Sequence, residues 1–303
     1  MAACIDSSRN HGAGAFCVDS CESQINTSLC KVIRFCRPSN VKPASCFSHS
    51  LQLERVEDHL WLKIREEALL DTDQEPILSE YYQTKILSHH SLESALANHL
   101  AEKLGSSSLS SDALFEVFVK ALTEEDAHGI KRAILDDLKA WKESDPACLS
   151  YVHCFLNFKG FLACQAQRIA HKFWVQGRNV LAVILQSRVS EVFGVDIHPG
   201  ARIGRGIVID HATGVVIGET AVVGDNVTIF HSVTLGGTGK VVGGDRHPKI
   251  GDGVLVGAGT KVLGNIRVGD GAKIGAGSVV LKEVPSRATV VGNPDKMVRQ
   301  SWQ

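Results

Sequence analysis

Residues 250–268 read IGDGVLVGAGTKVLGNIRV, with an aliphatic residue at every sixth position. A period of six fits neither a helix nor an alternating strand, and it is typical of a parallel β-helix in which three hexads close one coil. The aliphatic side chains are expected to point inward and to stack from coil to coil. The aliphatic residues form two runs, each with a step of six residues: Ile197, Ile203, Ile209, Val215, Ala221, Val227 and Val233, then Ile250, Val256, Val262, Val268, Ile274 and Val280.

The six-residue step breaks once, between Val233 and Ile250, so residues 236–249 are predicted to leave the coil as a loop. This loop is glycine-rich, polar and basic, and loops that project from a rigid scaffold are where function concentrates. A flat-sided prism cannot bury much of its outer surface alone. We therefore expect a homotrimer or a dimer of trimers.

A helical periodicity precedes the hexads. Apolar residues at positions 130, 134, 138 and 141 lie on one helix face, and a later helix is expected to end at Phe193-Gly194. The run Ser144-Asp145-Pro146 predicts a helix N-cap followed by proline at the first helical position. The fold class is therefore α+β, with an N-terminal all-α domain followed by a parallel β-helix of hexapeptide repeats.

The predicted domains are a disordered N-terminal extension at 1–50, the α-helical domain at 51–194, the β-helix at 195–294 and a short C-terminal tail at 295–303. Disorder is expected over 1–50 because this segment is rich in serine and lacks a sustained period. The extension is not clearly amphipathic, so we expect a cytoplasmic protein. A plastid or mitochondrial address carried by the extension is the alternative.

Composition excludes several classes of function. The 303 residues carry a net charge of −1, which argues against a general polyanion binder. The longest apolar run, at 180–185, is far shorter than the roughly 20 residues that cross a membrane. The nine cysteines show no CxxC pair and no zinc-ligand spacing, so we predict free thiols and no metal site.

Three polar segments interrupt the hexads: VDIHP at 195–199, DHATG at 210–214 and GDRHPK at 244–249. Together with TLGGTGK at 234–240 and the helical domain, they make the chain resemble the serine acetyltransferase family over about residues 56–294. The resemblance implies a left-handed β-helix and an enzyme that transfers acetyl from acetyl-CoA to the hydroxyl of L-serine. The products are O-acetyl-L-serine and CoA, in the first step of cysteine biosynthesis from serine.

A serine hydroxyl is a poor nucleophile at neutral pH, so its attack on a thioester needs a positioned base, usually histidine. The resemblance implies that this base is His211 and that Asp196 orients its ring. A zwitterionic substrate also needs a cation for its carboxylate and anions for its ammonium group. The family pattern implies these substrate-binding residues: Arg246 for the carboxylate, Asp145 and Asp210 for the ammonium group, and His247 beside the site.

The resemblance further implies that acetyl-CoA binds as a co-substrate in the groove between neighbouring prisms, with no permanently bound cofactor. The residues that it indicates for CoA are Gly237 and Ala258, through their backbone, and Lys273, for a phosphate. Family members that dock into O-acetylserine sulfhydrylase do so through a tail ending in isoleucine. Because Gln303 is the last residue here, we expect weak binding to that partner or none.

Other functions remain open on the sequence. Another hexapeptide-repeat acetyltransferase, acting on a sugar or xenobiotic, would need neither an arginine nor paired acids arranged for an amino acid. A zinc carbonic anhydrase of similar architecture would need three convergent histidines across a trimer interface. A weakly active regulatory subunit would keep the fold with little turnover.

Overall fold

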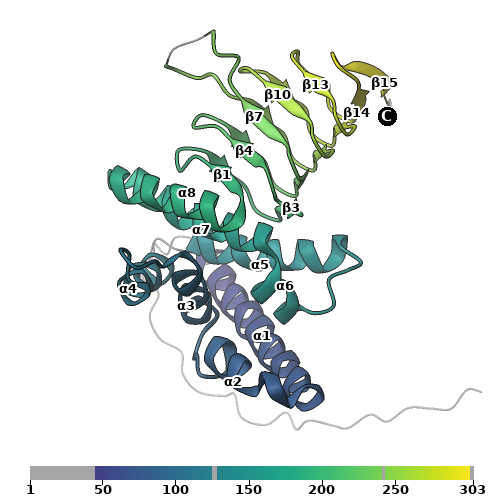
Figure 1. Cartoon of the computed structure of the whole chain (residues 1–303). Helices are drawn as coiled ribbons and strands as arrows, with labels where there is room; N and C mark the ends of the chain where they lie inside the picture. Colours follow the sequence, from purple (N-terminus) through teal and green to yellow (C-terminus); the bar gives the residue numbers. More distant parts are fainter. Residues whose placement is uncertain (1–44, 125–127, 241–242, 301–303) are drawn as a thin grey trace, which may run out of the picture. The chain divides into compact units, whose positions relative to one another are not determined.

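The computed structural model describes residues 45–124, 128–240 and 243–300 (Figure 1). Most of the extension predicted at 1–50 and the last residues of the tail lie outside these ranges. Within them the chain is helical up to Phe193 and forms strands from Val195 onward. The helical elements are α1 (Ser45–Gln74), η1 (Pro76–Leu78), α2 (Ser79–Tyr82), η2 (Gln83–Leu87), α3 (Leu92–Leu104), α4 (Ser111–Thr123), α5 (His128–Ser144), α6 (Tyr151–Asn157), α7 (Lys159–Val175) and α8 (Asn179–Phe193).

Local sequence explains where these helices run and end. Ile134, Leu138 and Trp141 of α5 are buried and Ile130 packs partly against them, so the predicted apolar face is confirmed. Helix α8 ends as predicted, because Gly194 takes a left-handed conformation with φ of 69°. Helix α1 begins at Ser45, before the predicted start of the helical domain at residue 51.

The turn after α5 differs from the prediction. Asp145 is not a helix N-cap, because its Oδ1 accepts a hydrogen bond from the backbone N–H of Ala147 at 2.8 Å and closes a tight turn. Helix α6 starts later, and its N-cap is Ser150, whose Oγ accepts from the N–H of His153 at 3.1 Å. Asp145 therefore follows the C-terminal end of α5 and closes a turn there, rather than starting a helix.

The strands of successive coils stack in parallel into three sheets, and β15 adds an antiparallel edge strand to one of them (Figure 1). Between the first two coils the partners are 20 residues apart, Ile197 with Ile217 and Ile209 with Ile229, rather than the 18 that the six-residue period predicts. Of the thirteen aliphatic positions, Ile203 is partly buried and the others are buried. The orders are β1-β4-β7-β10-β13, β2-β5-β8-β11 and β3-β6-β9-β12-β14-β15. The strands are β1 (Val195–Ile197), β2 (Arg202–Ile203), β3 (Val208–Asp210), β4 (Val215–Ile217), β5 (Val222–Val223), β6 (Thr228–Phe230), β7 (Thr234–Gly236), β8 (Lys249–Ile250), β9 (Leu255–Val256), β10 (Lys261–Leu263), β11 (Arg267–Val268), β12 (Lys273–Ile274), β13 (Val279–Val280), β14 (Ala288–Val291) and β15 (Lys296–Gln300).

The coils are not all alike. Asp210 pairs with Phe230 and Val216 with Thr234, so residues 211–215 fill a corner that residues 231–233 fill in the next coil. The predicted loop also leaves the coil, between β7 and β8. The predicted tail contains a strand that the sequence did not indicate, since β15 pairs antiparallel with β14.

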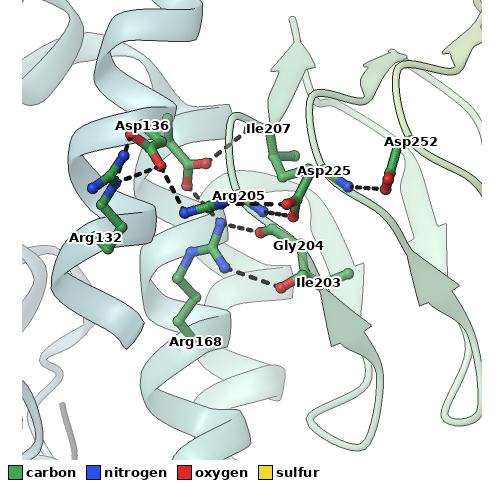
Figure 2. A network of polar contacts seen from close by, with 10 residues as sticks. Arg132, Asp136, Arg168, Ile203, Gly204, Arg205, Ile207, Asp225 and Asp252 are labelled. Carbon is green, nitrogen blue, oxygen red and sulfur yellow. Dashed lines mark hydrogen bonds and ion pairs between the residues drawn. The ribbon is translucent and has the colours of Figure 1, made fainter. Parts of the chain in front are cut away.

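A buried ion pair attaches the helices to the first coil (Figure 2). Arg168 of α7 donates from Nη2 to Oδ2 of Asp137 and to the carbonyl of Gly204, both at 2.7 Å, and from Nη1 to the carbonyl of Ile203 at 3.1 Å. Asp137 of α5 also accepts from the N–H of Ile207 at 2.8 Å. Both side chains are buried. The pair therefore holds α5 and α7 against the first coil, beside which the site lies.

Replacing Arg168 with methionine should lower the free energy of unfolding by about 3–5 kcal/mol, because it leaves the Asp137 carboxylate buried without its counter-ion. The measurement is denaturant unfolding of the purified protein. Arg132→Met is the matched control, since Arg132 is half exposed and pairs with Asp136 on the surface of α5. The control should cost less than about 1 kcal/mol. Equal losses in the two variants would show that the buried pair adds no stability of its own.

Candidate functional site

A cavity of about 420 Å³ lies between the helices and the first coil, and it brings together three of the predicted site residues. Asp145 comes from the turn after α5, and Asp210 and His211 come from the end of β3 and the corner that follows it. Trp141 and His153 form part of the helical wall. Two carboxylates and two histidines therefore line one cavity.

The corner after β3 presents His211 to this cavity. His211 and the next residue, Ala212, have φ of 54° and 56°, in the left-handed region that non-glycine residues seldom adopt. Such backbone strain is concentrated at functional sites. The His211 side chain is 77% exposed, and its Nε2 lies 3.9 Å from Oδ2 of Asp210. Its ring packs edge-to-face on His231 of the next coil, with 5.9 Å between ring centroids.

A close approach of α7 to β3 shapes the same cavity. A Cβ on Gly160 would lie 2.0 Å from the carbonyl oxygen of Ile209, so only glycine fits at this crossing. The crossing places Lys159 against the corner, where its Nζ donates to Oγ1 of Thr213. Lys159 places a positive charge at the wall of the cavity. The sequence did not predict this contact, because no motif surrounds Lys159.

Asp196 lies apart from the His211 ring. It sits in the middle of β1, and its Oδ1 accepts a hydrogen bond from Nε2 of Gln186 on α8 at 2.7 Å. Over the ranges that the structure describes, no hydrogen bond or ion pair joins Asp196 to His211. The orienting role that the resemblance implies for Asp196 therefore stays a prediction.

Arg246 and His247 lie in the loop between β7 and β8. Arg246 donates from Nη2 to Oε2 of Glu219 at 2.6 Å and from Nη1 to the carbonyl of Gly244 at 3.2 Å. The guanidinium holds the pKa of Glu219 below its usual value. His247 is only 8% exposed, and burial together with the nearby Arg246 lowers the pKa of its ring.

The cavity residues and the loop residues lie at opposite ends of the strands in the sheet that contains β4. His211 occupies the corner through which the chain enters β4, and the loop with Arg246 folds over the turn that follows β4. The three residues implied for CoA come from three different places in one chain. Gly237 follows β7, Ala258 follows β9 and Lys273 starts β12. The structure thus gathers Asp145, Asp210 and His211, and it separates them from Arg246 and His247.

In the described part of the chain, no group of three or more histidine, cysteine or acidic side chains is arranged to hold a metal ion. Over the same ranges, no helix is both long and apolar enough to span a bilayer. Cys148, Cys154 and Cys164 are free and buried.

Comparison with known proteins identifies the family. A family model described as "Serine acetyltransferase, N-terminal" matches residues 60–166, and one for the bacterial transferase hexapeptide repeat matches residues 247–282. The chain is 57% identical to "Serine acetyltransferase 1, chloroplastic" of Arabidopsis thaliana, over 94% of this chain and 90% of that protein. This chain belongs to the serine acetyltransferase family. Its activity is therefore serine O-acetylation in cysteine biosynthesis, and the enzyme is an acyltransferase.

Solved structures of this family share the fold. The soybean serine acetyltransferase complexed with serine is 58% identical, with a TM-score of 0.78 over 80% of this chain and 99% of that one. The Brucella abortus serine acetyltransferase in complex with coenzyme A is 48% identical, with a TM-score of 0.77 over 80% of this chain and 96% of that one. The predicted left-handed β-helix is confirmed for this serine acetyltransferase by these likenesses.

Proposed function

We propose that this chain acetylates L-serine with His211 as the general base. The observation that carries the proposal is the cavity in which His211, Asp210 and Asp145 meet. His211 takes the proton of the serine hydroxyl as its oxygen attacks the thioester carbonyl of acetyl-CoA. The tetrahedral intermediate then collapses, the C–S bond breaks, and the CoA thiolate receives the proton that His211 carried.

Charge in the cavity supports the choice of substrate. Asp145 and Asp210 offer two carboxylates to the ammonium group of an amino acid, which a sugar acceptor would not require. Arg246 offers a planar guanidinium to the substrate carboxylate. The soybean relative was solved with serine, which supports the same assignment here.

The separation of the two groups supports a site shared between protomers. Within one chain, Arg246 and His211 lie at opposite ends of the sheet that contains β4, so one chain does not present both to one substrate. In a trimer of prisms, the His211 corner of one copy faces the loop of the next copy. CoA would then lie in the groove between them, near Gly237 and Ala258 of the two walls and with Lys273 near a phosphate. The Brucella relative was solved with coenzyme A, which supports the co-substrate.

Mixing two impaired variants, assayed at serine concentrations well below the raised KM of Arg246→Ala, tests this arrangement. His211→Ala and Arg246→Ala protomers, co-expressed and purified together, should regain about a quarter of the wild-type rate, because random assembly pairs an intact corner with an intact loop at that frequency. The measurement is thiol release from acetyl-CoA with L-serine, beside each variant alone. A mixture as inactive as its components would place the whole site within one protomer. Release by the wild type with a sugar but not with serine would contradict the function itself.

Location and partner complete the proposal. Relatives of 57% and 60% identity are named chloroplastic and mitochondrial, which supports the organelle alternative for this chain. Residues 1–44, where such an address would lie, are outside the described ranges. Weak binding of O-acetylserine sulfhydrylase stays a prediction that concerns Gln303, which also lies outside them.

A further inference from the structure

Residues 218–220 form a short turn after β4. The side chain of Thr220 in this turn holds the backbone of Arg246 and His247. Oγ1 of Thr220 lies 3.0 Å from the backbone nitrogen of Arg246 and 3.1 Å from that of His247. Both nitrogens are N–H donors, so the hydroxyl oxygen accepts from each and uses both of its lone pairs. One threonine side chain thus fixes the backbone of the two residues that complete the proposed site.

Thr220 also contacts the His247 ring, and here the backbone settles the direction of the bond. The N–H of Thr220 lies 3.1 Å from Nδ1 of His247, and a backbone N–H can only donate. Nδ1 is therefore the acceptor. Oγ1 of Thr220 lies 2.9 Å from the same Nδ1, and its proton can go to that atom or to the neighbouring Asp245 carboxylate without altering this result.

We infer that Thr220 is a positioning residue that locks neutral His247 with its proton on Nε2, which makes His247 a hydrogen-bond donor to the reacting groups rather than a second base. The inference rests on the proposed function, since it assigns His247 a task in the serine site. A neutral imidazole carries one N–H, and an acceptor at Nδ1 leaves that proton on Nε2. Donors aimed at developing negative charge are a major source of catalysis in acyl transfer.

The surroundings of the ring agree with this role. Burial lowers the pKa of His247, which favours the neutral ring. A Cβ on Gly218 would lie 2.2 Å from Nε2, so the ring edge rests directly on the glycine of the turn. A Cβ on Gly237 would lie 3.7 Å from the same nitrogen, which places the Nε2 proton close to the backbone where acetyl-CoA is proposed to bind. The His211 ring, in contrast, is exposed at its corner.

Two variants isolate the hydroxyl of Thr220. Thr220→Val keeps the branched shape but leaves two backbone N–H groups without their acceptor, and it should lower kcat/KM for serine about 10- to 100-fold, with KM for acetyl-CoA unchanged. Thr220→Ser keeps the hydroxyl and should stay within about threefold of wild type. Thr228→Val is the matched control, a partly buried threonine of β6 outside the site, and it should leave both KM values unchanged.

A spectroscopic measurement tests the inference without relying on activity. Solid-state ¹⁵N NMR of histidine-labelled full-length protein at neutral pH should show His247, assigned by its loss in His247→Asn, with a protonated Nε2 and an unprotonated Nδ1. A protonated Nδ1 would overturn the inference, and so would Thr220→Val kinetics equal to those of Thr228→Val. Absence of serine acetylation by the wild type would contradict the proposed function instead, and the NMR result would remain readable.

Discussion

Replacing His211 with alanine should lower kcat by about 10²-fold or more, the usual scale for the loss of a general base. The imidazole sits on a rigid corner, and no other histidine of the cavity lies beside Asp210 as closely as His211 does. Affinity for acetyl-CoA should survive, because none of the residues proposed for CoA changes. The measurements are steady-state kinetics with L-serine and direct binding of acetyl-CoA to the purified variant.

His231→Ala is the matched control for this variant. His231 lies at the equivalent corner of the next coil, and its ring contacts that of His211. It has no proposed part in proton transfer, so its loss should change kcat little. Asp196→Asn should give a milder defect than His211→Ala, because the base is then disturbed but present. Turnover retained by a folded His211→Ala protein would remove the histidine from its proposed role.

Arg246→Ala should raise KM for serine about 10- to 100-fold, because the substrate carboxylate loses a charged two-pronged donor. KM for acetyl-CoA should stay nearly unchanged, since the guanidinium has no required contact with the thioester. Arg246→Lys should give an intermediate value, because it keeps the charge and loses the planar fork. Initial rates over a matrix of the two substrate concentrations give both constants.

Arg205→Ala is the control for loss of a positive charge. Arg205 is an exposed arginine of the first coil that pairs with Asp225 at a different corner, so neither KM should move. If Arg246→Ala raised both KM values together, the loop would organise the whole site rather than bind one carboxylate.

Much of the β-helix could be predicted because its rule is local. Each hexad needs only an inward aliphatic residue and a tight corner, so positions such as Val256 and Ile274 could be assigned to the interior without knowledge of their neighbours. The loop was predictable for the same reason, since it interrupts a strict period. The three motif segments carried the family resemblance and, with it, the site residues.

Features that depend on distant contacts could not be predicted. Asp145 before a proline has the pattern of a helix N-cap, but its side chain closes a turn to Ala147 and the next helix starts only after Ser150. Strand β15 forms because β14 offers a free edge, which its own sequence does not reveal. The placement of His211 and Arg246 at opposite ends of one sheet follows from coil register, and the family motif specifies no register.

The first and last coils of the β-helix are held by different contacts, and this difference determines where the β-helix begins to unfold. In a solenoid each coil contacts only its neighbours, so unfolding proceeds from the ends inward. The first coil is tied to α5 and α7 through Asp137 and Arg168, whereas the last coil is closed by the single antiparallel strand β15. Amide hydrogen exchange should therefore rise along the coils toward β14 and β15. The strands around His211 lie at the slow-exchanging end, so fraying under heat or denaturant would reach Lys273, the residue proposed for a CoA phosphate, before it reaches the proposed base.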